Sequence, residues 1–384
     1  MAKPFLTFNK EAKFIDFEGL PMVNVRVVNW RCIEDLELEL ARLNVFMGKN
    51  STGKSSLAYA IYFASKSRTY DPRTLITQLY GCGFDRVARL VENRPQFPIS
   101  IKLGDSEFSV KPSESTELPR KAEEQKVKER EREVEFGITK PATSPWTKEF
   151  LLPSKRISYI QVMMLVPKIM RELKAEPGAE AITRMLGVFM GSIFELLKAL
   201  FTSPPFWVFV SDYIEALTGL RFEPIIGEMR DIGSYMVEIH PLLSLIELTT
   251  QDPYTKLQLP AELSADGLLD FSIFDSMIKR IPENSLVVIE EPEIHKNPKM
   301  VIEFTELIVE RALDKKLTLI MTTHLDIPLL TLAKLVREQR LRVEDAKIYY
   351  FVRDPWTKLS EIKLHEDGTL ERLPDWEEAM TYLF

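Results

Sequence analysis

Residues 48–55 read Gly-Lys-Asn-Ser-Thr-Gly-Lys-Ser and match the phosphate-binding loop pattern G-x-x-x-x-G-K-[ST] at every fixed position. The apolar run at 43–47 before this loop predicts a buried strand, and residues 55–65 after it predict a helix. This order of strand, loop and helix is the context in which such a loop wraps around phosphate oxygens. The chain is therefore expected to build an α/β sheet with the loop at a strand end.

The residue types in the loop indicate what it binds. Glycines let the backbone approach phosphate oxygens, and a helix N-terminus supplies unpaired N–H groups and a favourable dipole. We expect Lys54 to reach the β- and γ-phosphates and Ser55 to ligate Mg²⁺, so the expected cofactors are ATP and Mg²⁺. The predicted nucleotide contacts in this region are Gly48, Lys49, Asn50, Ser51, Thr52, Gly53, Lys54, Ser55 and Ser56.

The composition fits a soluble globular protein. The chain has 384 residues, of which 45% are hydrophobic and 28% charged. Two cysteines cannot build a disulfide framework, and the N-terminus begins no apolar signal segment, so we expect a cytoplasmic protein. The net charge of −7 argues against a global nucleic-acid footprint. Charged and proline residues interrupt the apolar stretch 185–220, which argues against a membrane span and predicts two amphipathic helices broken at 203–205.

Changes in pattern divide the chain into several segments. Residues 1–20 are expected to form a leader. Residues 21–111 and 250–384 are expected to form one α/β lobe, a mixed sheet with antiparallel N-terminal strands around the phosphate-binding loop. The dense run of Lys, Glu and Arg at 112–135 predicts a charged loop or an exposed helix. The segment 136–249 predicts an inserted, mainly helical second lobe.

Alternating patterns predict strands in the first of these segments and near the end of the inserted lobe. Residues 23–28 and 36–40 predict two antiparallel strands that lead into the loop. Residues 99–103 and 106–110 predict a hairpin. Residues 221–259 predict short strands joined by Gly and Pro turns.

A second apolar run, Leu286–Ile289, ends in two carboxylates and predicts a strand buried in a parallel sheet. The carboxyl end of such a strand is where an open α/β sheet places its ligand chemistry. We expect Glu290 to hold Mg²⁺ directly or through water, and Glu291 to orient a water for attack on the γ-phosphate. Asn297 followed by Pro298 predicts the start of the next helix.

Two further segments add groups that could face a phosphate. Residues 317–321 predict a buried strand that leads to His324, which could hydrogen-bond a γ-phosphate. Ser264 and Gly267 precede a helix near Leu268 and predict an anion site at its N-terminus. No H-E-x-x-H or paired Cys/His spacing occurs, so a zinc site is not expected. The catalytic candidates are Lys54, Glu291 and His324, and the metal candidates are Ser55 and Glu290.

These motifs together resemble the ABC-type ATPase heads of the RecF/SMC group, and more closely the stand-alone AAA-type ATPases related to OLD (overcoming lysogenization defect) proteins. Residues 23–36 are similar to the group's opening strand, its Asn-aromatic-Arg turn and its second strand. Residues 289–295 resemble the acidic strand and following turn, Thr322–His324 the switch histidine, and 263–267 the signature motif. Arg156 resembles the arginine of a Pro-x-x-Arg segment between the lobes.

The resemblance implies an ATP-hydrolysing switch in which two heads sandwich two ATP molecules as a homodimer. Each site would combine the phosphate-binding loop of one subunit with Ser264 and Gly267 of the other. Glu291 would polarise the water, and His324 would sense the γ-phosphate.

Three positions depart from the family pattern or stay open. Glu290 replaces the aspartate that is usual at the Mg²⁺ position of ABC proteins, although the OLD-like branch often has glutamate there. Ala265 and Asp266 stand where transporters usually carry two small residues. The glutamine that links the metal to the second lobe is not assigned, and Gln161 and Gln78 are both candidates.

The resemblance also implies which functions this chain could have. The D-x-D element of OLD nucleases does not occur after His324, so we expect a head without its own nuclease. Such a head would drive a protein partner, such as a nuclease, in DNA repair or phage defence. We expect no membrane contact. An ABC transporter subunit is disfavoured by the large insertion between loop and signature. The alternative is a nucleotide-gated DNA-binding clamp with little turnover, whose candidate contacts are Lys334, Arg337, Arg340, Arg342 and the charge run at 120–132.

Overall fold

The structure is a computed structural model of the chain. The leader expected at 1–20 and nearly all of the charged run expected at 112–135 lie outside the residues that it describes. The same holds for most of the apolar stretch 185–220. The described residues are 22–113, 136–161, 204–218, 228–232, 235–242, 245–251, 258–260 and 266–374.

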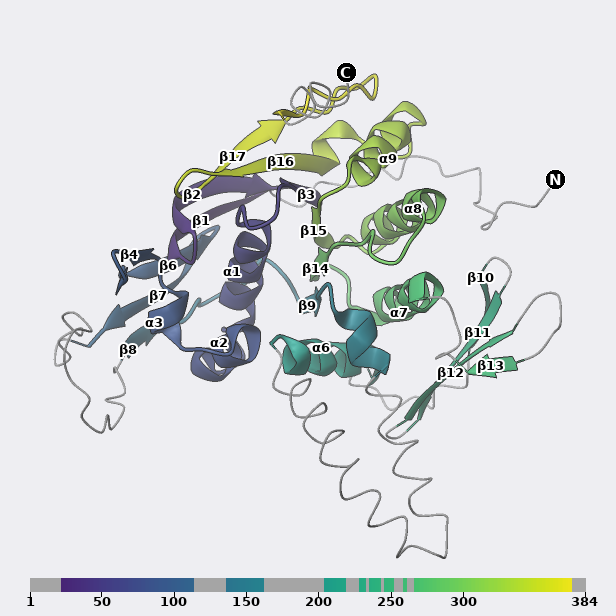
Figure 1. The fold of residues 1–384 in the computed structure, drawn as a ribbon, viewed down its shortest axis with the longest axis horizontal. Coiled ribbons are helices and arrows are strands. Elements are labelled where there is room, and N and C mark those ends of the chain that lie inside the picture. The colour runs from purple at the N-terminus through teal and green to yellow at the C-terminus, as the bar shows by residue number, and fades with distance from the viewer. Residues whose placement is uncertain are drawn as a thin grey trace, which may run out of the picture.

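A six-stranded sheet forms the centre of the fold (Figure 1). Its order is β17-β16-β3-β15-β14-β9, with β17 antiparallel to β16 and the other neighbours parallel. Every residue of β3, β9, β14 and β15 is buried, which confirms the buried parallel strands predicted around the loop and the acidic pair. The strands are β3 (Leu43–Gly48), β9 (Glu149–Leu152), β14 (Leu286–Glu290), β15 (Thr318–Thr323), β16 (Ala346–Arg353) and β17 (Thr357–Ile362).

A second, antiparallel sheet has the order β2-β1-β6-β7-β8. The pairing of β1 with β2 and of β6 with β7 confirms the antiparallel pair and the hairpin predicted from alternation. The strands are β1 (Val23–Trp30), β2 (Ile33–Leu40), β6 (Ile99–Leu103), β7 (Ser106–Pro112) and β8 (Phe136–Thr139), with a separate small pair, β4 (Leu90–Val91) and β5 (Arg94–Pro95).

The helix that follows the loop, α1 (Lys54–Lys66), lies between the two sheets (Figure 1). All of its residues from Leu57 to Lys66 are buried, because one side packs on β3, β14 and β15 and the other on β1 and β6. Helices α2 (Pro72–Tyr80) and α3 (Phe84–Val87) close the end of this core. The loop therefore leads into one of the most buried helices of the fold.

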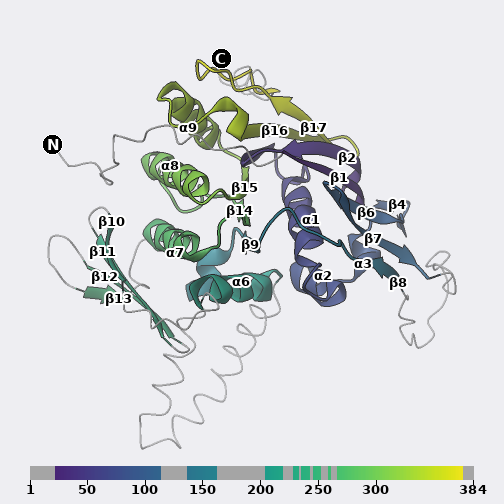
Figure 2. The same ribbon diagram turned by 180° about the vertical axis from the view of Figure 1, so that it is seen from behind.

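Four helices cover the other face of the six-stranded sheet, as Figure 2 also shows. Helix α8 begins as predicted, with Asn297 Oδ1 accepting a hydrogen bond from Met300 N at 3.0 Å and Pro298 in the first turn. Within the described ranges, no helix is long and apolar enough to cross a membrane. The helices are α6 (Phe206–Thr218), α7 (Asp266–Arg280), α8 (Pro298–Asp314) and α9 (Asp326–Arg337), and a short 3₁₀ turn, η2 (Val343–Asp345), follows them.

Residues 136–249 were expected to be mainly helical, but their described part contains several strands. Strand β8 joins the antiparallel sheet and β9 joins the central sheet, so the α/β lobe continues past residue 136, where the insertion was expected to begin. Strand β9 pairs with β14, with Glu149 opposite Leu286, and four residues are too few to show a period. A further four-stranded antiparallel sheet, in the region predicted to form short strands, contains β10 (Glu228–Ile232), β11 (Tyr235–Leu242), β12 (Leu245–Gln251) and β13 (Gln258–Pro260).

A buried carboxylate joins α1, α6 and β9. Asp212 on α6 is 1% exposed and accepts hydrogen bonds from Tyr62 Oη at 2.7 Å, Lys66 Nζ at 2.9 Å and Leu151 N at 2.8 Å. All three donors are buried, so water cannot replace the carboxylate without opening the core. Asp212 therefore fixes the far end of the helix that carries the loop.

Replacing Asp212 by alanine should lower the free energy of unfolding by about 3–5 kcal/mol, because it leaves a buried ammonium without its closest carboxylate. Urea unfolding followed by circular dichroism measures the change. The exposed neighbour Ser211→Ala is the matched control and should shift stability by less than about 0.5 kcal/mol. Equal unfolding midpoints for the two variants would contradict this account.

Candidate functional site

The loop between β3 and α1 turns through residues with left-handed backbone angles. Gly48 has a φ of 143°, Ser51 of 63° and Gly53 of 107°, and Gly53 precedes the first turn of α1. Lys54 and Ser55 therefore start at the positive end of a helix. This is the backbone arrangement that the loop motif predicts for an anion site.

The hairpin of β16 and β17 supports this loop, a contact that sequence reasoning missed. Thr357 Oγ1 donates a hydrogen bond to Thr52 O at 2.8 Å across a separation of 305 positions. A Cβ on Gly48 would collide with the carbonyl of Phe351, and one on Gly53 would collide with Thr357 Oγ1. Close packing as well as backbone angle therefore requires these two glycines.

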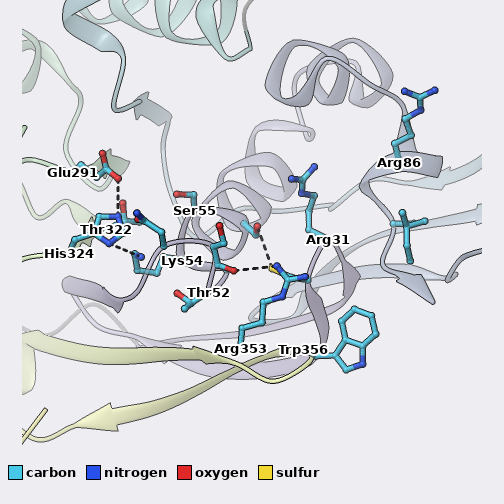
Figure 3. Close-up of a pocket in the computed structure, with 17 residues that line it drawn as sticks. Arg31, Thr52, Lys54, Ser55, Arg86, Glu291, Thr322, His324, Arg353 and Trp356 are labelled. Atoms are coloured by element: carbon cyan, nitrogen blue, oxygen red, sulfur yellow. Dashed lines mark hydrogen bonds and ion pairs between the residues drawn. The ribbon is translucent and has the colours of Figure 1, made fainter. Parts of the chain in front are cut away.

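A pocket of about 520 Å³ lies over the loop (Figure 3). Its size falls within the range of small-molecule sites, about 300–1,000 Å³. It brings together the predicted residues of the loop from Asn50 to Ser56 with Glu291 and His324. The pocket is also lined by residues to which the sequence assigned no role, namely Arg31, Cys32, Arg86, Ala88, Leu90, Thr322, Arg353 and Trp356.

Lys54 is 5% exposed, and its ammonium group lies against the loop. Its Nζ donates to Gly48 O at 2.7 Å and to Lys49 O at 2.8 Å, and it lies 3.3 Å from His324 Nδ1. Burial lowers the pKa of Lys54 to about 8, and the carboxylates that follow β14 offset only part of this effect. The free protein therefore stabilises the charged form of Lys54 poorly, and a bound phosphate would stabilise it.

Glu291 and His324 face each other across the ends of β14 and β15. Glu291 has a φ of 45°, which turns the chain at the strand end. Its Oε1 lies 3.0 Å from His324 Nε2, and His324 Nδ1 lies 3.0 Å from Gly48 O (Figure 3). With a proton on Nε2, the ring donates to the carboxylate and can accept from Lys54 at Nδ1. The three predicted catalytic residues are thus joined by direct contacts.

Glu293 holds His324 in place, and sequence reasoning gave it no role. Its Oε1 accepts hydrogen bonds from Thr323 Oγ1 at 2.8 Å and from His324 N at 2.9 Å. Its Oε2 is buried without a hydrogen-bond partner among the described residues. The Glu-Glu-Pro-Glu run that contains Glu293 was the available signal, but the contact itself spans two strand ends.

Glu290 ends β14 and is 8% exposed. Its Oε2 accepts hydrogen bonds from Tyr59 Oη at 2.8 Å and from Ser154 N at 3.2 Å. Tyr59 lies one helical turn after Ser55, so Glu290 faces the side of α1 that carries the Ser55 hydroxyl. A hydroxyl and a carboxylate fit Mg²⁺, which usually takes one or two protein carboxylates beside phosphate and water.

Arg156 is buried beneath the acidic turn at 1% exposure. Its Nη1 donates to Glu290 O at 2.6 Å, while Nε and Nη2 pair with the two oxygens of Asp270 on α7 at 2.5 and 2.7 Å. Lys296 contacts the same carboxylate. Burial opposes ionisation of Asp270, but Arg156 and Lys296 outweigh it and lower the pKa of Asp270. This cluster links α7 to the end of the acidic strand.

Of the two residues predicted for the signature, Gly267 lies in α7 and Ser264 lies outside the described residues. A Cβ on Gly267 would lie 2.6 Å from His295 O, so the packing of α7 on the acidic turn by itself accounts for glycine there. A contact between Gly267 and a nucleotide remains a prediction.

Neither glutamine candidate lines the pocket. Gln161 donates from Nε2 to Asp266 Oδ1 at 3.0 Å, at the first residue of α7. Gln78 lies half-buried on α2. Gln161 is therefore the candidate that connects the region after β9 with the helix that follows the predicted signature.

Comparisons with known proteins agree with this architecture. Residues 22–160 match the family model of the AAA ATPase domain. A solved SMC head bound to the C-winged helix domain of ScpA aligns with a TM-score of 0.51 and 12% identity, covering 90% of this chain and 99% of that chain. At this identity the likeness concerns the fold, and it confirms the expected class, a mixed α/β fold of the ABC/SMC head type.

Two further solved structures show lower similarity. The SMC head domain from Thermotoga maritima aligns with a TM-score of 0.42 and 10% identity, covering 89% of this chain and 99% of that chain. An SMC head with an extended coiled coil, bound to the C-terminal domain of ScpA derived from Pyrococcus furiosus, aligns with a TM-score of 0.45 and 12% identity, covering 94% of this chain and 98% of that chain. The comparison with curated proteins found no match. The OLD-like subgroup remains a prediction.

Binding of a triphosphate should weaken above pH 8. Lys54 has a pKa of about 8 in the free protein, and phosphate oxygens would raise it on binding. Below pH 8 the proton is already present, whereas above pH 8 binding must take up a proton. Affinity should therefore be about tenfold lower at pH 9 than at pH 7. Isothermal titration in two buffers of different ionisation enthalpy measures the affinity and the proton uptake.

The matched control for this titration is Lys54→Met, which removes the titrating group. It should bind more weakly at both pH values and lose the proton uptake. A wild-type affinity that stays constant from pH 7 to pH 9 would contradict the assignment of the linked proton to Lys54.

Proposed function

We propose that this chain is an ATP-binding and ATP-hydrolysing switch of the ABC/SMC head type. The observation that carries the proposal is that Lys54, at the start of α1, meets Glu291 and His324, which follow β14 and β15, at one pocket. The match of residues 22–160 to the AAA ATPase domain and the likeness of fold to an SMC head support it.

In this proposal the loop holds the phosphates. Backbone N–H groups of the loop and of the first turn of α1 would face the phosphate oxygens, and Lys54 would exchange its loop carbonyls for the γ-phosphate. Ser55 and Glu290 would hold Mg²⁺, which when bound would neutralise charge on the β- and γ-phosphates.

Glu291 is proposed to orient the attacking water and to accept its proton. The water oxygen forms a bond to the γ-phosphorus, the bond between that phosphorus and the bridging oxygen breaks, and the electron pair leaves with the β-phosphate. His324 connects Glu291 with Lys54, so the arrival of a γ-phosphate at Lys54 changes the contacts of the carboxylate through a single ring. This connection provides the γ-phosphate sensing proposed for His324.

The active form is proposed to be a homodimer with ATP at the interface. Leu325, next to His324, and Leu330, in α9, are 42% and 49% exposed, and these apolar side chains would be available to a dimer interface. Ser264 and Gly267 of a second copy would then complete each site. One solved SMC head is bound to a domain of ScpA, and we propose that this head likewise acts on a protein partner, such as a nuclease in DNA repair or phage defence.

The DNA-clamp alternative receives little support from three of its four late basic candidates. The fourth, Arg337, is exposed, and the charge run at 120–132 lies outside the described residues. Lys334 pairs with Glu306 at 2.5 Å, Arg340 with Glu338 at 2.9 Å, and Arg342 with Asp345 at 2.8 Å. Cations that are already neutralised by neighbouring carboxylates offer less attraction to a phosphate backbone. The switch is therefore the function that the described residues favour.

Two substitutions test the switch. Lys54→Ala should abolish ATP hydrolysis, because the γ-phosphate loses its cation. Glu291→Gln should keep ATP binding but slow hydrolysis by about a hundredfold or more, and it should leave an ATP-bound dimer. Phosphate release and light scattering during gel filtration measure the two effects, with the exposed Glu338→Gln as control. Hydrolysis at the wild-type rate in both site variants would refute the proposed function.

A third substitution separates binding from catalysis. Glu293→Ala removes both hydrogen bonds that hold Thr323 and His324, so kcat should fall about tenfold or more while the Kd for ATP changes little. Turnover and equilibrium binding are measured on the same preparation, beside the exposed Glu366→Ala. A parallel loss of binding and turnover would instead indicate a purely structural role for Glu293.

A further inference from the structure

Trp356 is the only Phe, Tyr or Trp among the described residues that line the pocket, and the proposed reaction gives it no role. It lies in the turn between β16 and β17, directly before Thr357, which bonds to Thr52 of the loop. Thr357 N also donates to Cys32 O at 2.9 Å, which ties the turn to the end of β1 and β2. These bonds hold the backbone next to Trp356 against the phosphate-binding loop.

The orientation of the Trp356 ring is also fixed, from outside the pocket. Arg89 Cζ lies 4.7 Å from the ring centroid. Arg89 is itself held by Glu34 at 2.8 Å and by Asn29 Oδ1 at 3.0 Å. Arg89 does not line the pocket, whereas Trp356 does.

The direction of a bound nucleotide follows from the chemistry at the two ends of the pocket. Lys54, Glu291 and His324 gather at one end, which is the end for the γ-phosphate (Figure 3). Arg31 and Trp356 lie at the other end, beyond the loop (Figure 3). A nucleotide whose γ-phosphate sits at Lys54 must extend its nucleoside toward Trp356.

The outer end of the pocket combines apolar side chains with three guanidinium groups, those of Arg31, Arg86 and Arg353 (Figure 3). Ala88 and Leu90, the chain neighbours of Arg89, also line the pocket, and Leu90 is 46% exposed. The guanidinium of Arg31, which lies over the Tyr80 ring at 5.0 Å, and that of Arg86 add hydrogen-bond donors. The one carboxylate among the lining residues, Glu291, is at the opposite end.

We propose that Trp356 stacks on the nucleobase of the bound nucleotide, on the side of the ring that Arg89 leaves open. This inference rests on the proposed function, since it uses the same pocket. The hairpin of β16 and β17 would then support the loop through Thr357 and bind the base through Trp356. Stacking on an indole accepts any base, so the subsite distinguishes a nucleoside triphosphate from inorganic polyphosphate more than one base from another.

The test compares two ligands on the full chain. Isothermal titration measures the Kd of ATP and of inorganic tripolyphosphate, which carries the phosphates without a base. Trp356→Ala should weaken ATP binding by about tenfold and leave tripolyphosphate binding unchanged. Trp356→Phe, which keeps an aromatic face, should retain most of the ATP affinity. Trp207→Ala is the matched control, because Trp207 is 50% exposed on α6 and does not line the pocket.

Each outcome decides the inference. Selective loss of ATP affinity in Trp356→Ala, with recovery in Trp356→Phe, supports base stacking. Unchanged ATP affinity overturns it while leaving the proposed function intact. An equal loss for both ligands also overturns it, because the substitution would then act through the loop. A wild-type chain that binds tripolyphosphate as tightly as ATP shows that no base subsite exists, and one that binds neither refutes the proposed function itself.

Discussion

The parallel pairing of β3 with β15, and of β15 with β14, is the constraint on which the site depends. In this register Met47 lies opposite Thr323, and Thr322 lies opposite Glu290. The next residues after these positions in β3, β15 and β14 are Gly48, His324 and Glu291, so the groups that meet over the pocket lie at neighbouring strand ends. A slip of one residue would send each strand's side chains to the opposite face and separate these groups.

Two buried carboxylates connect the elements that carry the site to the helices around them. Asp212 binds the far end of α1, while Asp270 binds Arg156 beneath the acidic turn. Removing one partner from such a cluster leaves an uncompensated charge, which costs far more than an exposed ion pair contributes. The loop helix and the acidic turn are therefore each held by contacts that cannot be exchanged for water.

Local patterns were sufficient for the elements that carry the proposed chemistry. The loop motif, the buried runs before Gly48 and Glu290 and the cap at Asn297 each lie within a few residues of one another in the chain, and each has its predicted structure. Strand β9 was not predicted, because four residues show no period and its partner β14 is remote in the sequence. Glu293 was not predicted either, because its hydrogen bonds join the ends of two different strands.

The sequence by itself thus predicted a nucleotide as the ligand and named three candidate catalytic residues, and it determined the buried strands β3, β14 and β15 beside them, because a phosphate-binding loop and buried strands are encoded by neighbouring residues. The tertiary structure decided what surrounds them. Thr357 reaches Thr52 across 305 positions, and Arg156 reaches Asp270 across 114. No local period encodes such pairs, since each depends on two distant segments being placed against the same sheet. The support of the loop and the surroundings of the outer pocket were therefore visible only in the folded chain.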